Sequence, residues 1–377
     1  MKVPFVDLAV HDPQLRTELL AAMEGVLVRG DYVLGREVEE FEREFAAYCG
    51  AEYAVGVSSG TSALVLSLRA AGIGAGDEVI TVANSFLATV SSILLAGARP
   101  VLVDVADDEN IDVDAVRAAI SPRTRAVLAV DLRGYPARLD ELRELADDHG
   151  LVLLDDASQA HGARLHGRPV GTQADFSCFS LHPLKNLPAP GDAGVILTRT
   201  REAAERLRAW RNHGLADRGF AAVLGDNARL DSILAATLRV RLGRLDVDNG
   251  RRAATARTYD DAFADLPITL PPRAPGHVSV VHHYVIQVQD RPELLRSLAD
   301  AGVDARVHYE VPAHRQPAFR DQVIVPRPLR RTEEQAQRIV SLPCSPALTQ
   351  PQVDLVIEAV RLHYHQARVS TERLQAR

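Results

Sequence analysis

Residues 126–157 read AVLAVDLRGYPARLDELRELADDHGLVLLDDA, and their pattern decides the fold. Apolar runs at 126–132 and 151–157 have the length and the Val/Leu content of buried strands. Residues 138–149, between them, have a helical pattern. A strand, a helix and a second apolar strand in this order are typical of parallel strands covered by helices.

The same alternation extends in both directions along the chain. Strands are predicted at seven segments: 53–59, 78–83, 100–105, 126–132, 151–157, 176–181 and 193–198. Helices are predicted between several of them, at 61–72, 86–97, 112–120 and 138–149. These elements predict an α/β fold, with a seven-stranded, mostly parallel sheet that is covered on both faces.

A chain of 377 residues is too long for one small core, so more than one domain is expected. An amphipathic helix precedes the sheet, one or two long helices follow it, and the last hundred residues mix a strand, a loop-rich stretch and a final helix (13–30, 230–266, 280–289, 306–330 and 350–366). We predict a large α/β domain at 1–245 and a smaller α+β domain at 246–377.

Composition excludes several classes of protein. The net charge of -7 argues against a nucleic-acid binder, which needs a basic face. Cys49, Cys178 and Cys344 are widely spaced and odd in number, which favours neither a disulfide framework nor a metal site and indicates the reducing cytoplasm. No run approaches the ~20 apolar residues of a membrane span. His282 and His283 would face opposite sides of a strand, so no metal is predicted.

Ligands bind at the carboxyl ends of the strands in parallel sheets, so the residues after each strand matter most. Gly60, Thr61 and Ser62 follow the first strand and open a helix, which is typical of a phosphate cradle but also of an ordinary helix start. Asp156 ends an apolar strand three residues before Gln159. A carboxylate there indicates a cationic partner, such as a protonated ring nitrogen, or an acidic helix cap.

Lys185 stands in SLHPLKNLPAPGD (180–192), and only Lys2 accompanies it among 43 lysines and arginines. Its neighbours include three prolines, which indicate a shaped loop and not a helix. A solvated surface lysine is the ordinary interpretation, but this chain uses arginine almost everywhere on its surface. Lysine can form a Schiff base and arginine cannot, so a covalent role is predicted for Lys185.

These three sites together suit one ligand. A phosphate cradle, a carboxylate for a pyridinium nitrogen and a Schiff-base lysine are what pyridoxal 5'-phosphate requires. An aromatic side chain should cover the ring, and Phe86 follows the strand at 78–83. The alternative for Phe86 is plain helix packing.

Six stretches occur in an order that resembles a known family: SSGTSAL, DDASQAHGA, SLHPLKNLPAPGDAG, RNHG, GDNARLD and VHYEVPAHRQPAF. Together they resemble the DegT/StrS-type sugar aminotransferases, which are fold type I enzymes that use pyridoxal phosphate. The resemblance runs from VPFVDL near the N-terminus to the final helix. It implies the fold type I architecture, with a large sheet domain and a smaller C-terminal domain.

The resemblance also implies a role for each matching residue. Lys185 would hold the cofactor as a Schiff base and move protons, Asp156 would pair with the pyridine nitrogen, and Gln159 with the phenolic oxygen. Residues implied in cofactor binding are Gly60, Thr61, Ser62, Phe86, Asp156, Ser158, Gln159, Ser180 and Asn227. Asn227 would reach the phosphate of a neighbouring subunit, which implies a homodimer with shared active sites. Residues implied on the substrate side are Asn186, His308 and Tyr309.

Several positions depart from the family pattern. The family often has His-Leu-Tyr-Gly-Gln where this chain has DLRGY (131–135), and Glu-Asp where it has Asp155 and Asp156. It usually has an aromatic residue at Ala228 and Gln-Ala-Ala within 233–236. None of these positions is the lysine or the Asp156 carboxylate, so they bear on the identity of the substrate.

The predicted function is transfer of an amino group from an amino acid, such as glutamate, to a keto-sugar nucleotide in a ping-pong cycle. A nucleotide-linked keto-deoxyhexose fits the resemblance, and Asn186 after the lysine favours amination at C3 over C4. A keto-cyclitol, or another pyridoxal-phosphate-dependent modification of a sugar, is the alternative within this fold. A nucleotide-binding oxidoreductase would need a GxGxxG turn after its first strand, and SSGTSA does not supply one.

Overall fold

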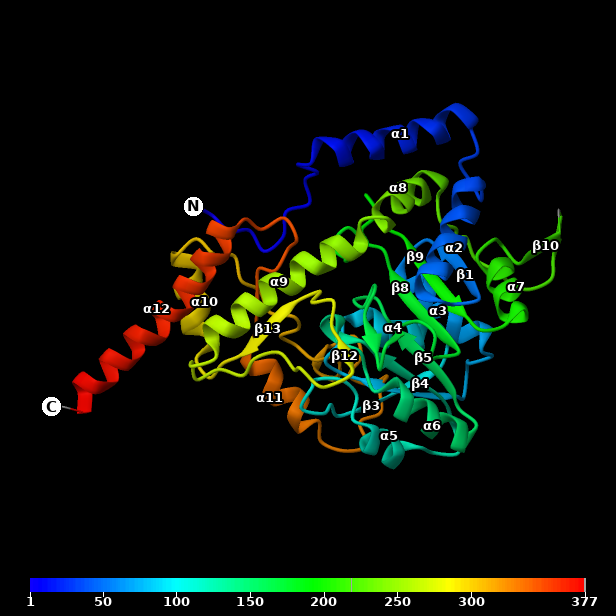
Figure 1. Cartoon of the computed structure of the whole chain (residues 1–377). Helices are drawn as coiled ribbons and strands as arrows, with labels where there is room; N and C mark the ends of the chain where they lie inside the picture. Colours follow the sequence, from blue (N-terminus) through cyan, green and yellow to red (C-terminus); the bar gives the residue numbers. More distant parts are fainter. Residues whose placement is uncertain (218, 376–377) are drawn as a thin grey trace.

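A computed structural model describes residues 1–217 and 219–375, with side chains described for all of these except 216–217 and 366–375. The chain forms a large α/β part and a smaller C-terminal part, and helix α9 (Leu245–Phe263) runs from one to the other (Figure 1). Helix α1 (Pro13–Arg29) lies along the outside next to α8 (Ser232–Leu242).

The large part is built on a seven-stranded sheet in the order β1-β9-β8-β5-β4-β2-β3. Its strands are β1 (Tyr53–Val57), β2 (Glu78–Val82), β3 (Arg99–Val103), β4 (Thr124–Val130), β5 (Val152–Asp156), β8 (Phe176–Ser180) and β9 (Gly194–Thr198). β9 is antiparallel to both of its neighbours, and the other pairs are parallel. The predicted α/β fold and its seven strands are therefore confirmed.

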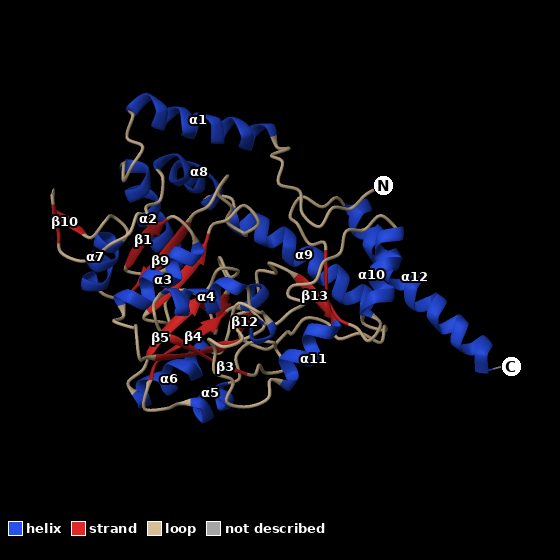
Figure 2. Cartoon of the chain, turned by 180° about the vertical axis from the view of Figure 1, so that it is seen from behind, coloured by secondary structure: helices blue, strands red, loops and turns tan. Residues whose placement is uncertain are grey.

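Helices cover both faces of this sheet, as Figure 2 shows with the strands in red. One face packs its buried Val, Ile and Leu side chains against α3 (Gly60–Ala70), α4 (Leu87–Leu95) and α7 (Arg201–Trp210). The other packs against α2 (Arg36–Cys49) and α8 at one end and against α5 (Val113–Ala119) and α6 (Leu139–His149) at the other. The strands are apolar on both sides because neither face meets water.

The C-terminal part has its own core. Strands β13 (Tyr284–Gln287) and β14 (Ile339–Leu342) pair antiparallel and pack with α9, α10 (Arg291–Asp300) and α12 (Gln350–Gln375). Val3 lies in this core and pairs with Val303 through a parallel bridge, so the first residues of the chain pack with the last. Helix α9 begins beside the predicted boundary at 245/246, and the division into two domains stays a prediction.

The predicted strand at 280–289 is shorter than expected. Only β13 is a strand, because the backbone N–H groups of Val280 and His282 donate to the carbonyls of Gly134 and Arg133 at 3.0 and 2.9 Å. Val281 between them has a φ of 48°, which a regular strand does not adopt. Residues 280–282 are thus held against a loop of the large part.

Short elements and some helices are additional to the predicted pattern. They are α2, α7, α11 (Arg330–Arg338), the 3-10 turns η1 (Leu132–Gly134) and η2 (Ala313–Arg315), and the short strands β6 (Arg164–Leu165), β7 (Arg168–Pro169), β10 (Leu215–Asp217), β11 (Phe220–Ala221) and β12 (His277–Val278). Strands of two or three residues leave no readable alternation, since their pairing depends on tertiary contacts.

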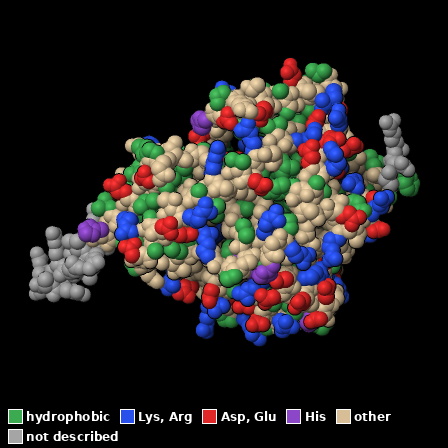
Figure 3. Space-filling model, in the orientation of Figure 1, with side chains coloured by type: hydrophobic (Ala, Val, Ile, Leu, Met, Phe, Trp, Pro, Cys, Tyr) green, Lys and Arg blue, Asp and Glu red, His purple; other side chains and the backbone are tan. Residues whose placement is uncertain are grey.

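Acidic and basic side chains are interspersed over the face drawn in Figure 3. Among the described helices, none has an apolar stretch long enough to cross a membrane.

Candidate active site

Lys185 lies in the loop between β8 and β9, at the carboxyl end of β8. Its backbone N–H donates to the carbonyl of His182 at 2.8 Å, and buried Leu187 and Ala189 anchor the loop in the core. Burial lowers the pKa of the Lys185 amine to about 8, although the Asp156 charge opposes the shift. A pKa near 8 leaves roughly one amine in ten uncharged at pH 7.

Asp156 ends β5 as a buried carboxylate with fixed hydrogen bonds. Thr89 donates its hydroxyl to Oδ2 at 2.7 Å, and the N–H of Ser158 donates to Oδ1 at 3.3 Å. Ser85 hydrogen-bonds Thr89 in turn at 2.9 Å. Donors from the segment after β5 and from α4 thus hold both carboxyl oxygens in place, where they can face a cationic partner.

The start of α3 forms a cluster of hydroxyls around exposed backbone N–H groups. Ser59 caps the helix by accepting from the N–H of Ser62 at 3.0 Å, and the Ser62 hydroxyl lies 3.0 Å from that of Ser58. A Cβ on Gly60 would come within 2.6 Å of the Ser180 Cβ, so only glycine lets β8 approach this turn. Thr61 stands in the first turn, half-buried. This arrangement suits a phosphate group.

Gln159 contacts a loop of the large part and a residue of the C-terminal part. Its Oε1 accepts from the backbone N–H of Arg133 at 2.6 Å, which directs Nε2 toward the hydroxyl of Tyr309 at 3.4 Å. The ring of Phe86 is 52% exposed and lies 5.8 Å from the Tyr309 ring. Gln159, Tyr309 and Phe86 therefore surround one space from three segments of the chain.

Three histidine rings form a column beside Lys185. His282 and His283 lie 4.1 Å apart between ring centroids, and His283 stacks on His308 at 4.0 Å. The expectation that His282 and His283 face opposite sides of a strand is wrong, because they precede β13 in an irregular segment. Burial lowers the pKa of His308 to about 4 and those of His282 and His283 well below their ordinary value, so the column is uncharged at neutral pH.

Asn186 lies beneath this column. Its Oδ1 lies 3.0 Å from Nδ1 of His282, and its Nδ2 donates to Asn249 at 2.8 Å and to the carbonyl of Val280 at 3.1 Å. The buried amide thus contacts protein groups on every side. A contact between Asn186 and substrate stays a prediction.

A cavity of ≈ 330 Å³ opens beside the histidine column. Leu184, the residue before the lysine, and Phe5 from the N-terminal segment line it. Two arginines, Arg252 and Arg306, also face it. Asp304 lines it too and pairs with Arg306 at 2.9 Å, so the described lining keeps a net positive charge through Arg252, which suits a substrate that carries anionic groups.

Asn227 stands apart from the other predicted cofactor residues. It is exposed, and its backbone forms a bridge with Asn212, next to the segment that pairs with β1. Within one chain its described partners are therefore surface residues.

Sequence reasoning singled out the DLRGY segment, which holds Arg133, but it missed Thr89 and Glu109 at this site. Thr89 binds the Asp156 carboxylate, and its signal was a hydroxyl one helical turn after Ser85 in ANSFLAT. Arg133 forms a buried ion pair with Glu109 and donates to the carbonyl of His308 at 3.4 Å. Glu109 and Arg133 meet only through the fold, so no local pattern could show their pairing.

Among the residues that the structure describes, no three His, Cys, Asp or Glu side chains form a group that could hold a metal ion.

Comparisons with known proteins agree on one family. The family model described as the DegT/DnrJ/EryC1/StrS aminotransferase family matches residues 13–361. The chain is 46% identical over 362 residues to the dTDP-3-amino-3,4,6-trideoxy-alpha-D-glucose transaminase of Streptomyces venezuelae, covering 96% of both chains. It is 37% identical over 365 residues to the UDP-N-acetyl-3-dehydro-alpha-D-glucosamine 3-aminotransferase of Acidithiobacillus ferrooxidans, covering 96% of this chain and 98% of that protein.

Solved structures give the same result. S. venezuelae DesV in complex with a ketimine intermediate superposes with a TM-score of 0.93 at 46% identity, over 96% of this chain and 98% of that one. Bacillus subtilis NtdA, solved with bound cofactor PMP, superposes with a TM-score of 0.89 at 30% identity, over 97% of this chain and 85% of that one. The chain therefore belongs to the DegT/DnrJ/EryC1/StrS aminotransferase family and is an aminotransferase that uses pyridoxal phosphate.

Proposed function

We propose that Lys185 is the residue that holds the cofactor and moves protons during amino transfer. Bound pyridoxal phosphate supplies an electron sink, which lets an amino group pass between two carbon skeletons. A nucleophilic amine must be uncharged when it attacks, and the pKa of about 8 makes part of Lys185 so at neutral pH. The same value suits a proton shuttle, because a general acid–base works best near the ambient pH.

The other residues would bind and orient the cofactor. Asp156 would face the ring nitrogen, held in place by hydrogen bonds from Thr89 and Ser158. The start of α3, with Gly60, Thr61, Ser62 and Ser180, would hold the phosphate, and the close approach at Gly60 shapes the cradle for it. The Gln159 amide, turned by the Arg133 N–H, would donate to the phenolic oxygen. Phe86 would cover the ring.

One observation carries this proposal: a buried lysine with a pKa near 8 and a buried carboxyl group lie at the carboxyl ends of the neighbouring strands β8 and β5. A Lys185→Ala protein should lose covalent attachment of pyridoxal phosphate. Borohydride reduction followed by peptide mass spectrometry would locate the attachment in the parent protein. Attachment at any other residue, or unchanged attachment in Lys185→Ala, would contradict the proposal.

We further propose that the amino acceptor is a nucleotide-linked keto-sugar aminated at C3, with an amino acid such as glutamate as donor. Several similar proteins are named for amino transfer to C3 of dTDP- or UDP-sugars, including the two relatives above and a dTDP-3-amino-3,6-dideoxy-alpha-D-galactopyranose transaminase. Arg252 and Arg306 at the cavity beside Lys185 suit the diphosphate of such a substrate.

Half-reaction spectroscopy tests the acceptor. The protein is loaded with pyridoxamine phosphate, and keto-sugar nucleotides with the oxo group at C3 or C4 are added in parallel. We expect the cofactor absorbance to return to that of the aldehyde form with the C3 compounds. Return with a C4 compound alone, or only with a keto-cyclitol, would refute the proposed acceptor without affecting the proposed cofactor chemistry.

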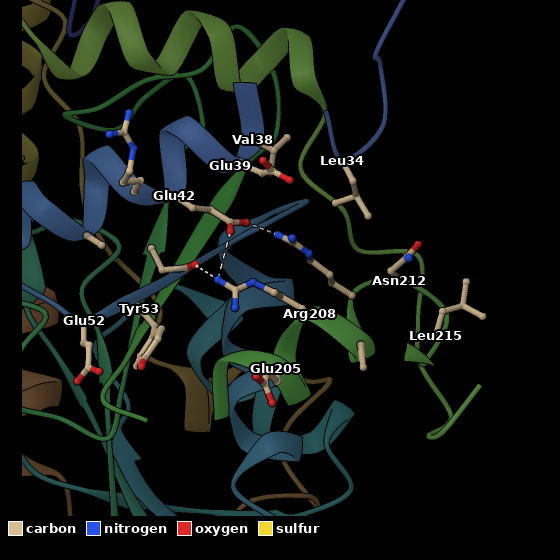
Figure 4. A pocket seen from close by; sticks show the side chains of 15 residues that line it. Leu34, Val38, Glu39, Glu42, Glu52, Tyr53, Glu205, Arg208, Asn212 and Leu215 are labelled. Atoms are coloured by element: carbon tan, nitrogen blue, oxygen red, sulfur yellow. Dashed lines mark hydrogen bonds and ion pairs between the residues drawn. The ribbon is translucent and has the colours of Figure 1, made fainter. Parts of the chain in front are cut away.

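We propose a homodimer in which Asn227 serves the partner's site. Support comes from the exposed apolar side chains near it, since Phe220 is 70% and Leu224 90% exposed. A cavity of ≈ 860 Å³ lies between α2, β1 and α7, next to the antiparallel pair β10–β11 that contains Phe220. In this cavity Glu42 forms ion pairs with Arg208 and Arg211 (Figure 4). An open cavity beside exposed apolar residues suits a partner subunit.

Complementation tests the shared site. Lys185→Ala and Asn227→Asp chains are each expected to be impaired, and mixed dimers of the two would contain one site with both native residues. We expect activity to return after the two proteins are unfolded and refolded together. Failure to regain activity, with dimers shown by light scattering, would argue that each chain builds its site alone.

We propose the cytoplasm as the compartment. Cys49, Cys178 and Cys344 are all free thiols and buried, which suits a reducing environment.

A further inference from the structure

Two buried carboxyl groups lie on the opposite face of the sheet from Asp156. Asp155 precedes Asp156 in β5 and so points to the other side, and Asp131 directly follows β4. Ala129 of β4 is in register with Asp155, which brings Asp131 beside it. Both side chains are 0% exposed.

These two carboxyl groups have each other and few other partners. Oδ1 of Asp131 accepts from the N–H of Ala137 at 2.7 Å. Oδ2 of Asp131 and both oxygens of Asp155 are buried without a hydrogen-bond donor, so a proton on either carboxyl group would give the pair the donor that it lacks. Among the side chains that the structure describes, no lysine, arginine or histidine forms an ion pair with either group.

The surroundings would penalise two negative charges. The Asp156 carboxyl group is the next residue of β5. On the neighbouring strand β8, Ser177 is in register with Asp155 and Cys178 with Asp156. Ser177 is the neighbouring hydroxyl that faces Asp155. Two carboxylates are both acceptors, so they cannot hydrogen-bond to one another without a proton between them. A second negative charge next to the first in a buried site is also unfavourable.

We propose that Asp131 and Asp155 share a proton at neutral pH, as an acid–carboxylate pair that positions the loop of Arg133 and, through it, Gln159. One carboxyl O–H donates to an oxygen of the other, and no bond to carbon changes. The pair acts through Asp131, whose bond to Ala137 closes the loop 131–137. Both residues are positioning residues. The link to the cofactor rests on the proposed role of Gln159.

Electrostatics support this geometry. Burial raises the pKa of Asp131 to about 7 and that of Asp155 well above its ordinary range, and the nearby Asp156 charge adds to both shifts. Because the two groups interact, their protons belong to the pair and leave in two coupled steps. The pair therefore keeps at least one proton at pH 7, while Asp156 on the other face is held by donors.

The loop 131–137 contacts Gln159 of the predicted site through a hydrogen bond from Arg133. The backbone N–H of Arg133 fixes Oε1 of Gln159 at 2.6 Å, so the Gln159 amide cannot turn over without losing that bond. Loss of the shared proton would leave two adjacent negative charges. Their repulsion should weaken the hydrogen bond from the Ala137 N–H to Asp131. The orientation of Gln159 should then change with pH.

Infrared spectroscopy of the holoenzyme tests the shared proton directly. We expect the carbonyl band of a protonated, buried carboxyl group at pH 7 in the parent protein. The band should disappear in Asp155→Asn and in Asp131→Asn but persist in Glu144→Gln, an exposed control on α6. Absence of the band from the parent protein would overturn the proposal even if neither variant folds, and even if the proposed substrate is wrong.

A second measurement separates positioning from packing. The cofactor absorbance of the holoenzyme is followed against pH for the same three variants. We expect the midpoint of its change to move in Asp155→Asn and to match the parent protein in Glu144→Gln. A midpoint that stays the same in Asp155→Asn, in a protein that folds and binds pyridoxal phosphate, would show that the pair does not reach Gln159.

Discussion

The two sides of the sheet at the end of β5 treat neighbouring carboxyl groups in opposite ways. Asp156 is supplied with donors from Thr89 and Ser158, which stabilise a negative charge. Asp155, one residue earlier, is buried with only another carboxyl group and Ser177 near it, which disfavours a charge. Two neighbouring carboxyl groups of similar depth thus differ in their hydrogen-bond donors, and donors to a carboxylate favour its charged form.

Replacing Asp156 should have the largest effect. We expect Asp156→Asn to lower kcat by roughly 10²–10³-fold, because a neutral amide cannot stabilise a positive ring nitrogen in this water-poor site. Steady-state kinetics with saturating pyridoxal phosphate would measure it. A loss below about threefold would mean that Asp156 is not the charged partner.

Removing one donor should have an intermediate effect on the same face. Thr89→Val keeps the shape and deletes the 2.7 Å hydrogen bond to Asp156. A hydrogen bond to a charged group is worth about 1.5 kcal/mol at the low end, which is roughly tenfold in affinity for the cofactor. Titration of the apoprotein with pyridoxal phosphate gives the value. Thr17→Val, on exposed α1, serves as the control and should bind as the parent protein does.

Buried His161 should make the stability of the folded protein rise with pH, whereas Asp131 and Asp155 should make it fall. Burial lowers the pKa of His161 to about 3, and the Lys185 charge adds to the shift. Between pH 6.5 and 3 the unfolded chain binds the proton and the folded chain does not, so stability falls as the pH falls, by up to about 1.4 kcal/mol per pH unit. His161→Leu should remove this slope in urea unfolding.

Asp131 and Asp155 should change the stability with pH in the opposite direction to His161. Their raised pKa values mean that the folded state binds more protons than the unfolded state from about pH 4 upward, so their contribution falls as the pH rises toward 7. His161→Leu should therefore expose a curve that declines more clearly with pH. An unchanged curve would mean that His161 is protonated alike in both states.

Removing the Ser177 hydroxyl should have the smallest effect. The nearby Ser177 hydroxyl lowers the pKa of Asp155, against the larger effect of burial, which raises it. Ser177→Ala should therefore raise the pH at which the carboxyl pair loses its proton, by an amount equivalent to about 0.5 kcal/mol. The infrared band, followed against pH, reports it, and a shift to lower pH would contradict the assigned direction.

The fold was readable from the sequence because buried parallel strands are continuous apolar runs, and all seven formed where such runs stand. Lys185 and Asp156 could be singled out because each follows such a strand. The His282–His283 stack could not, since it depends on backbone bonds from 280 and 282 to the loop at 133–134. Local pattern also gave no sign that Asp131 would meet Asp155, because β4 and β5 bring them together.

The packing of Val3 among residues of the last helix bears on the order in which the nascent chain can fold. All strands of the large sheet have left the ribosome once residue 198 has, so that sheet can assemble early. The second core must wait for Val353 and Val360. Val3 also lacks its bridge partner until Val303 has emerged, so the first residues to be synthesised join their core late.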